Sequence, residues 1–171
     1  MQVLVYAVVA IVAFAVLIVV WGLLRIRKGN AQASEAIRKV RIDEIDGLVA
    51  EGKAGLAKAY GIEIDLADRE AAARVLDALF ADQTKLKSAF EWDGFYWRFV
   101  LPVGALIGEY IRIHGNGVWR QDPAGLAMEF PAKDGTVTCY PFDKVLKQVN
   151  SGDKGDIYAY LVAFSTLSSL K

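Results

Sequence analysis

The segment VWRQDPAGLAMEFPAKDGTVTCY, residues 118–140, decides the fold class of this chain. Its DPAG sequence at 122–125 matches a type I turn, with Asp first, Pro second and Gly fourth. Residues 126–130 then alternate at the two-residue period of a half-buried strand. Lys133-Asp134-Gly135 turns the chain into the β-branched run 136–140. Because short turns join neighbouring strands, the segment predicts a three-stranded antiparallel meander.

Helical patterns lie on both sides of this meander. Before it, Ser34 and Asp65 are suited to begin helices, and the apolar residues between 103 and 113 point to most sides of a central buried helix. After it, Pro141 and Asp156 are suited to begin two further helices. The sequence therefore predicts an α+β fold with a helical region, the meander and two C-terminal helices.

Two further features of these helices concern which residues face water and which pack closely. The polar residues of the helix after Asp65, namely Glu70, Arg74 and Asp77, are expected to face water. In the central helix, Gly104 and Gly108 form a small-xxx-small pair that lets another backbone approach closely. We expect this pair to serve packing inside the domain, with a contact between two copies as the alternative.

An apolar segment precedes the predicted domain. From Val3 to Leu24 the chain has 22 residues without a charge, and at about 1.5 Å per residue they cover roughly 33 Å, enough for a bilayer core of about 30 Å. Arg25, Arg27 and Lys28 follow at once. By the positive-inside rule, this single-pass signal anchor predicts an N-terminus outside and a domain in the cytoplasm.

The composition fits an anchored domain. The 20 basic and 20 acidic residues all follow Leu24 and give a formal net charge of zero. We predict a transmembrane anchor with its basic flank at 1–28, a linker at 29–33 and a cytoplasmic α+β domain at 34–171. A cleaved signal peptide is the alternative, since Ala31-Gln32-Ala33 precedes Ser34, but the basic cluster lies where a neutral region belongs. Cleavage would release an exported domain.

A resemblance covers residues 108–164. It rests on Gly-Glu-Tyr-Ile-Arg at 108–112, the Gly-rich turn before Trp119, Pro-Phe-Asp-Lys-Val at 141–145 and the segment 156–160. This part of the chain resembles a small bacterial α+β domain family of unknown function. The resemblance implies a bacterial protein with a cytoplasmic domain, which would place the anchor in the inner (plasma) membrane. It implies no catalytic residue.

Four polar residues are the candidates for chemistry: Glu109, Arg112, His114 and Cys139. His114 is the one His and Cys139 the one Cys of the chain, so a zinc site of three or four ligands would need several carboxylates. Neither phosphate-binding glycine motif occurs. The sequence predicts no metal and no cofactor. A Cys–His nucleophile pair and a pocket around Glu109 and Arg112 stay open as alternatives to an inert thiol and an intrahelical ion pair.

An aromatic block and a basic cluster are the candidates for contact with partners. Residues 90–99 hold six aromatic side chains, of which Trp92, Tyr96 and Trp97 are the candidate docking residues, with core burial and headgroup contact as alternatives. The candidate contacts with anionic lipid are Arg25, Arg27, Lys28, Arg38, Lys39 and Arg41. Nucleic acid is not an expected partner, because no further basic stripe with interleaved aromatics occurs.

Together these features predict a single-pass, membrane-anchored interaction module that is not an enzyme. It would serve as an accessory or assembly subunit of a bacterial membrane complex, or as an adaptor, with the bilayer and a protein as its partners. The alternative is a small-ligand-binding or enzymatic domain built on Glu109, Arg112, His114 and Cys139.

Overall fold

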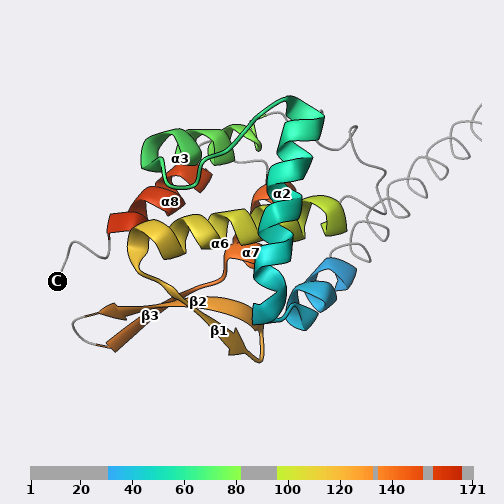
Figure 1. Ribbon diagram of the computed structural model, residues 1–171. Helices are drawn as coiled ribbons and strands as arrows, with labels where there is room; N and C mark the ends of the chain where they lie inside the picture. Colours follow the sequence, from blue (N-terminus) through green and yellow to red (C-terminus); the bar gives the residue numbers. More distant parts are fainter. Residues whose placement is uncertain (1–30, 82–95, 133–134, 152–155, 167–171) are drawn as a thin grey trace, which may run out of the picture. The chain divides into compact units, whose positions relative to one another are not determined.

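The computed structural model of the chain describes residues 31–81, 96–132, 135–151 and 156–166 (Figure 1). The chain divides into two compact units, 1–32 and 33–171. The predicted anchor, Val3 to Leu24, lies outside the described residues. Within the ranges that are described, no helix combines the length and the apolar character needed to cross a bilayer.

The second unit is an α+β domain with a three-stranded antiparallel sheet, which confirms the predicted fold class. A helix covers residues 31–39 at the start of the described part. The elements that follow are η1 (Ile42–Glu44), α2 (Ile45–Tyr60), α3 (Arg69–Ala78), the π-helical turn η2 (Tyr96–Val100), α6 (Leu101–Gly115), β1 (Val118–Asp122), β2 (Gly125–Ala132), β3 (Gly135–Cys139), α7 (Pro141–Ser151) and α8 (Asp156–Thr166).

The sheet is the predicted meander, with strand order β1-β2-β3. Trp119 pairs with Met128, and Met128 pairs with Cys139, so these three side chains share one face, and all three are buried. The alternate residues lie on the opposite face, where Val118, Thr136 and Thr138 are exposed and Ala127 is buried. Figure 1 shows the helices gathered over one side of the sheet, which is therefore the core side.

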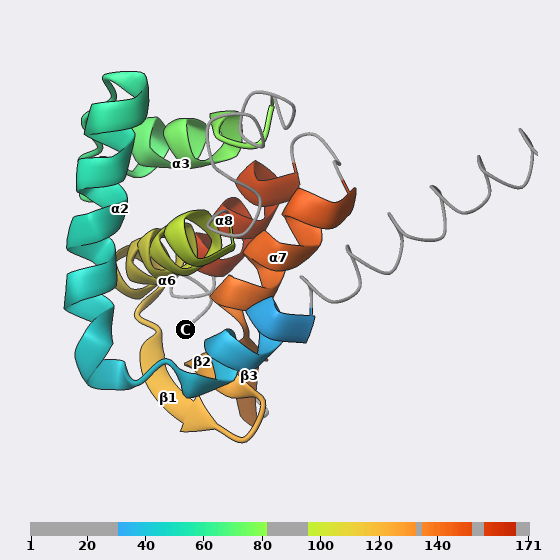
Figure 2. The ribbon, with the colours of Figure 1, turned by 90° about the vertical axis from the view of Figure 1, so that its right-hand side faces the viewer.

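Helix α6 is the central helix, as its pattern predicts, and α2, α3, α7 and α8 all pack on it (Figure 2). Its two glycines permit this packing. A Cβ added at Gly104 would lie 2.5 Å from the Phe142 ring, and one added at Gly108 would lie 2.1 Å from the Trp119 indole. The glycine pair therefore serves internal packing, as expected.

The helix at residues 31–39 belongs to the domain core. Ala33, Ile37 and Val40 are buried, and a Cβ added at the turn glycine Gly125 would lie 3.4 Å from Ile37. The last residues of the predicted linker, 31–33, are thus helical. The apolar spacing of Ala33, Ile37 and Val40 at four and three residues is the physical reason, because it places all three on one helix face.

Helix α3 begins at Asp68 rather than Asp65. The Asp68 carboxylate accepts a hydrogen bond from the Ala71 amide at 3.0 Å, as an N-cap does. Asp65 instead closes the preceding turn by accepting from the Ala67 amide at 2.9 Å. Both residues are competent caps, and the turn at Asp65 delays the helix by three residues.

Helices α3 and α8 pack side by side and antiparallel (Figure 1). Near the C-terminal end of α3, Asp77 accepts a hydrogen bond from the Tyr158 amide in the first turn of α8, at 3.0 Å. At the other end, Arg69 donates to Ser165 in the last turn of α8, at 2.8 Å. A carboxylate thus lies at the positive end of the α8 dipole and a guanidinium at its negative end, an arrangement that stabilises the helix.

Candidate functional site

The candidate residues Glu109 and Arg112 form an ion pair within α6. The Arg112 guanidinium donates two hydrogen bonds to the Glu109 carboxylate, at 2.8 and 2.6 Å. This pairing raises the pKa of Arg112 above its ordinary value. The Arg112 side chain is half exposed, at 50% of its maximum, whereas the Glu109 side chain is largely buried at 16%, so the pair lies at the edge of the domain with its cation toward the solvent.

His114 points toward the segment that precedes α3. Its Nε2 lies 2.8 Å from the Leu66 carbonyl oxygen, and its ring lies 4.6 Å from the Tyr110 ring. A carbonyl oxygen can only accept, so Nε2 carries the proton in this contact. The imidazole therefore joins α6 to the α2–α3 connection.

Cys139 lies on the core face of β3 beside Tyr160 of α8. Burial raises the pKa of the Cys139 thiol to about 11. Burial, with Cys139 nearby, also raises the pKa of the Tyr160 hydroxyl. The Lys144 ammonium lies 5.4 Å from the centre of the Tyr160 ring and pairs with Asp156. Both the thiol and the phenol are therefore neutral near pH 7.

The four candidate residues thus have separate surroundings. Glu109 and Arg112 bind each other on the domain surface, His114 contacts Leu66, and Cys139 contacts α8. Sequence spacing identifies the first pair, but the contacts of His114 and Cys139 join elements far apart in the chain. In the part of the chain that the structure describes, no group of three His, Cys, Asp or Glu side chains is arranged to hold a metal ion.

The raised pKa of Cys139 predicts slow reaction with thiol reagents. The nucleophile is the thiolate, and a rise of its pKa from 9.0 to about 11 lowers the thiolate population at pH 7.5 roughly 100-fold. We expect N-ethylmaleimide to label native Cys139 about 100-fold more slowly than a surface cysteine, with the rate still rising as the pH approaches 11.

The matched control is Thr138→Cys in a Cys139→Ala background, which places a thiol at the exposed neighbouring position of the same strand. In denaturant, the unaltered chain and this variant should react with N-ethylmaleimide at equal rates. Equal rates in the native state would show that Cys139 is accessible and activated, and would restore the thiol as a candidate nucleophile.

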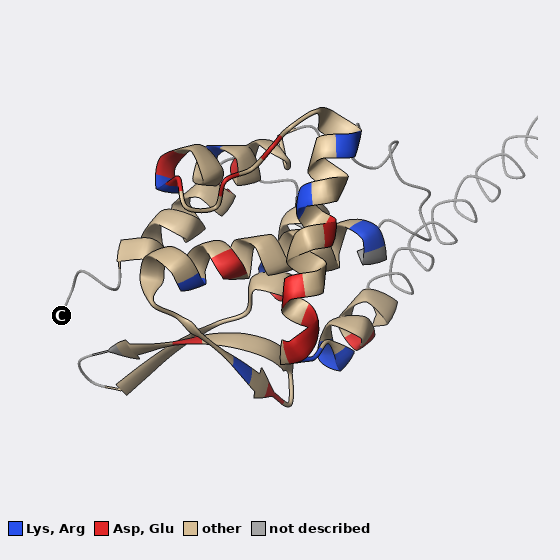
Figure 3. Ribbon diagram, viewed as in Figure 1, with Lys and Arg blue, Asp and Glu red and all other residues tan. Residues whose placement is uncertain are grey.

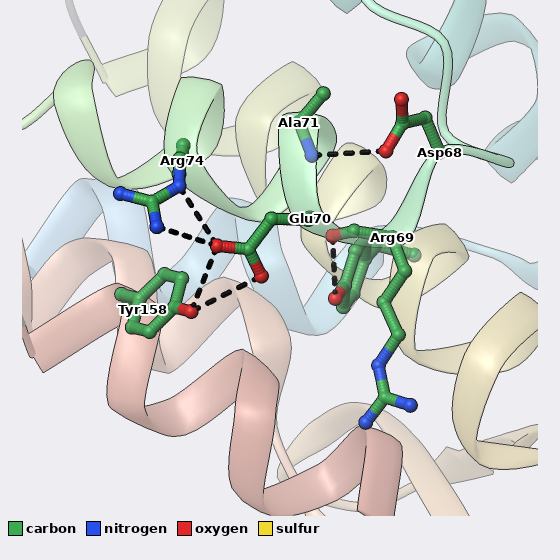
Figure 4. A network of polar contacts seen from close by, with 7 residues as sticks. Asp68, Arg69, Glu70, Ala71, Arg74 and Tyr158 are labelled. Atoms are coloured by element: carbon green, nitrogen blue, oxygen red, sulfur yellow. Dashed lines mark hydrogen bonds and ion pairs between the residues drawn. The ribbon is translucent and has the colours of Figure 1, made fainter.

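A second network joins α3 to α8 and was not identified from sequence (Figure 4). Glu70 accepts hydrogen bonds from Arg74 at 2.8 Å and from the Tyr158 hydroxyl at 3.2 Å. The Arg74 guanidinium carbon also lies 5.8 Å from the centre of the Tyr158 ring. The four-residue spacing of Glu70 and Arg74 could have indicated their pairing, whereas nothing local indicates Tyr158.

Two of the three candidate lipid contacts that are described, Lys39 and Arg41, are paired with acids. Lys39 pairs with Glu35 at 2.6 Å, and Arg41 donates to both oxygens of Asp43 at 3.0 and 2.9 Å. Figure 3 shows Lys, Arg, Asp and Glu interspersed along this part of the chain. Arg38 is exposed. Arg25, Arg27 and Lys28 lie outside the described residues.

The candidate docking residues fall at the edge of the described chain. Trp92 lies outside it, and of Tyr96 and Trp97 only the backbone is described, as the start of η2. One ring of the aromatic block is placed: Phe99 is buried and packs edge-to-face on Phe80 at 5.7 Å. Part of the block therefore belongs to the core.

Comparison of the chain with protein family models, with curated proteins and with solved structures finds no match. The resemblance of residues 108–164 to a small bacterial α+β domain family stays a prediction.

Proposed function

We propose that this chain is a single-pass, membrane-anchored interaction module that is not an enzyme. It acts as an accessory or assembly subunit of a bacterial membrane complex, or as an adaptor, with its domain in the cytoplasm. The observation that supports this proposal over the enzymatic alternative is the separation of Glu109 and Arg112, His114 and Cys139 into three different surroundings.

The anchor is supported by the uncharged run from Val3 to Leu24 and by the basic residues that follow it. Only eight residues, 25–32, separate this run from Ala33, which is already a core residue of the domain. The distance from Leu24 to Ala33 is therefore at most roughly 30 Å, even for a fully extended chain. An anchored domain would therefore be confined close to the bilayer surface, where it can meet only partners in or on the same membrane.

The docking surface proposed for a protein partner includes Trp92, Tyr96 and Trp97. Adjacent aromatic residues at 95–97 cannot all face one side at either the helical or the strand period, so at least one ring is left for a surface. Trp and Tyr are the residue types enriched at the energetic centres of interfaces. For lipid, the contribution of Lys39 and Arg41 is reduced by their acidic partners, which leaves Arg25, Arg27, Lys28 and Arg38 as the main proposed contacts.

The anchor proposal predicts that charge in the middle of the apolar run releases the chain from membranes. Two arginines at the centre of a spanning helix cost about 5–7 kcal/mol together on the insertion scale. We expect the double variant Ala13→Arg/Val16→Arg to move from the carbonate-resistant membrane fraction to the soluble fraction, while a reporter fused after Lys171 in the unaltered chain reports the cytoplasm.

The matched control is Ala13→Leu/Val16→Leu, which keeps the run apolar and should stay in the membrane. Chemical cross-linking in intact membranes should also give discrete larger species that contain the unaltered chain. A soluble unaltered chain or a reporter outside the cell would overturn the anchor and its orientation. A chain that is anchored but never cross-linked would overturn the interaction role.

A further inference from the structure

The two edge strands of the sheet, β1 and β3, differ in how they are protected from pairing with another chain. At the β1 margin, η1 packs against the strand, and the Gln121 amide donates to the Val40 carbonyl at 3.4 Å. That strand also carries two charged residues, Arg120 and Asp122. Charges and covering segments are the usual means by which an edge strand is kept from pairing with another chain.

Strand β3 forms the other edge of the sheet, and among the described residues it has neither charges of its own nor an extensive covering segment. Gly135–Cys139 contains no charged residue, and β2 is the one element among the described residues that contacts it extensively. Thr136 and Thr138 are exposed on the face opposite the core. An uncharged strand with β-branched residues at a sheet margin is suited to add a further strand through backbone hydrogen bonds.

The sequence of β3 is suited to antiparallel pairing with β3 of a second copy. Thr136-Val137-Thr138 reads the same in both directions. An antiparallel pair related by a two-fold axis at Val137 places Thr136 opposite Thr138 of the second copy and the two Val137 residues opposite each other. Threonine pairs and β-branched pairs are favourable cross-strand neighbours in antiparallel sheets.

We propose that β3 pairs antiparallel with β3 of a second copy of this chain, so that two three-stranded sheets become one sheet. The formal net charge of zero means that two copies do not repel each other as wholes. A single strand pair is a small interface, and the inference rests on the proposed membrane anchorage to supply the high effective concentration that such an interface needs.

The test uses charge pairs across the proposed two-fold axis in the full chain. In Thr136→Lys/Thr138→Lys every cross-copy pair is Lys opposite Lys, whereas in Thr136→Glu/Thr138→Lys every such pair is Glu opposite Lys. The two variants share Lys at 138 and differ only at 136. We expect the first to lower the association constant at least tenfold and the second to keep it within threefold of the unaltered chain.

Association is measured by energy transfer between two differently labelled copies, in membranes and in mild detergent at a known protein concentration. Mixing Thr136→Lys/Thr138→Lys with Thr136→Glu/Thr138→Glu should restore energy transfer, because each Lys then meets a Glu. Thermal melting of each variant is the folding control, and the exposed positions of both threonines predict melting temperatures close to that of the unaltered chain.

Equal association of the Lys/Lys and Glu/Lys variants would show that β3 is not the interface and would overturn the inference. A monomeric unaltered chain, or one whose β3 binds a different protein in place of a second copy, would overturn it as well. Failure of the anchor is a separate result: a soluble chain would contradict the proposed function, while the charge series in solution would still decide the strand pairing.

Discussion

Replacing Gly108 by Ala should destabilise the domain by about 1–3 kcal/mol, the usual cost of overpacking a tight core contact. The added Cβ would lie 2.1 Å from two carbon atoms of the Trp119 indole, whose bulky ring cannot move without displacing Phe142. The gain of about 1 kcal/mol from the better helix propensity of Ala is too small to offset this. Thermal or urea unfolding in mild detergent measures the loss.

Gly55→Ala is the matched control, since Gly55 is also helical but has no neighbouring atom within 4 Å of an added Cβ. It should stabilise the domain by about 0.5–1 kcal/mol. In a Trp119→Phe background the cost of Gly108→Ala should shrink, because the outer indole atoms that the Cβ meets are absent. A Gly108→Ala variant as stable as the unaltered chain would contradict the packing of α6 on the sheet.

Phe142→Ala should cost about 3–5 kcal/mol of unfolding free energy, the range for truncating a buried aromatic ring. The Phe142 side chain is fully buried at 0% exposure and lies between Gly104 and Trp119, with ring centres 5.9 Å apart in the latter contact. No smaller side chain at 142 can contact both neighbours, so a cavity remains. The same unfolding measurement applies.

Val162→Ala provides the comparison for Phe142→Ala. Val162 is an exposed apolar residue of α8, and its truncation should change the unfolding free energy by no more than about 0.5 kcal/mol. If the two variants lost stability equally, the Phe142 side chain would not be part of the buried core.

The parts of the fold that sequence predicts are those governed by local spacing. The meander follows from the turn at 122–125 and the two-residue period after it, and α7 begins at Pro141 as expected. The start of α3 is not local in this sense, because Asp65 and Asp68 can each cap a helix and only the turn at Asp65 decides between them.

In the candidate site, too, contacts set by local spacing can be predicted from sequence, whereas contacts between distant elements cannot. The pairing of Glu109 with Arg112 follows from their three-residue spacing. The expectation that Asp77 faces water is wrong in part, because its carboxylate caps α8 at a position 81 residues further along the chain. The neighbours of His114 and Cys139 likewise come from other elements, so residue type and spacing alone cannot show whether the candidates converge.

The two hydrogen bonds that join the ends of α3 and α8 constrain the order in which this chain can fold during synthesis. Tyr158 and Ser165, the hydrogen-bond partners of Asp77 and Arg69, are synthesised 81 and 96 residues after them. Contacts of such long sequence separation form late, after the loop between them has closed. The amino-terminal apolar segment is synthesised first, so if it inserts into a membrane as we propose, the domain would complete its folding only after that insertion.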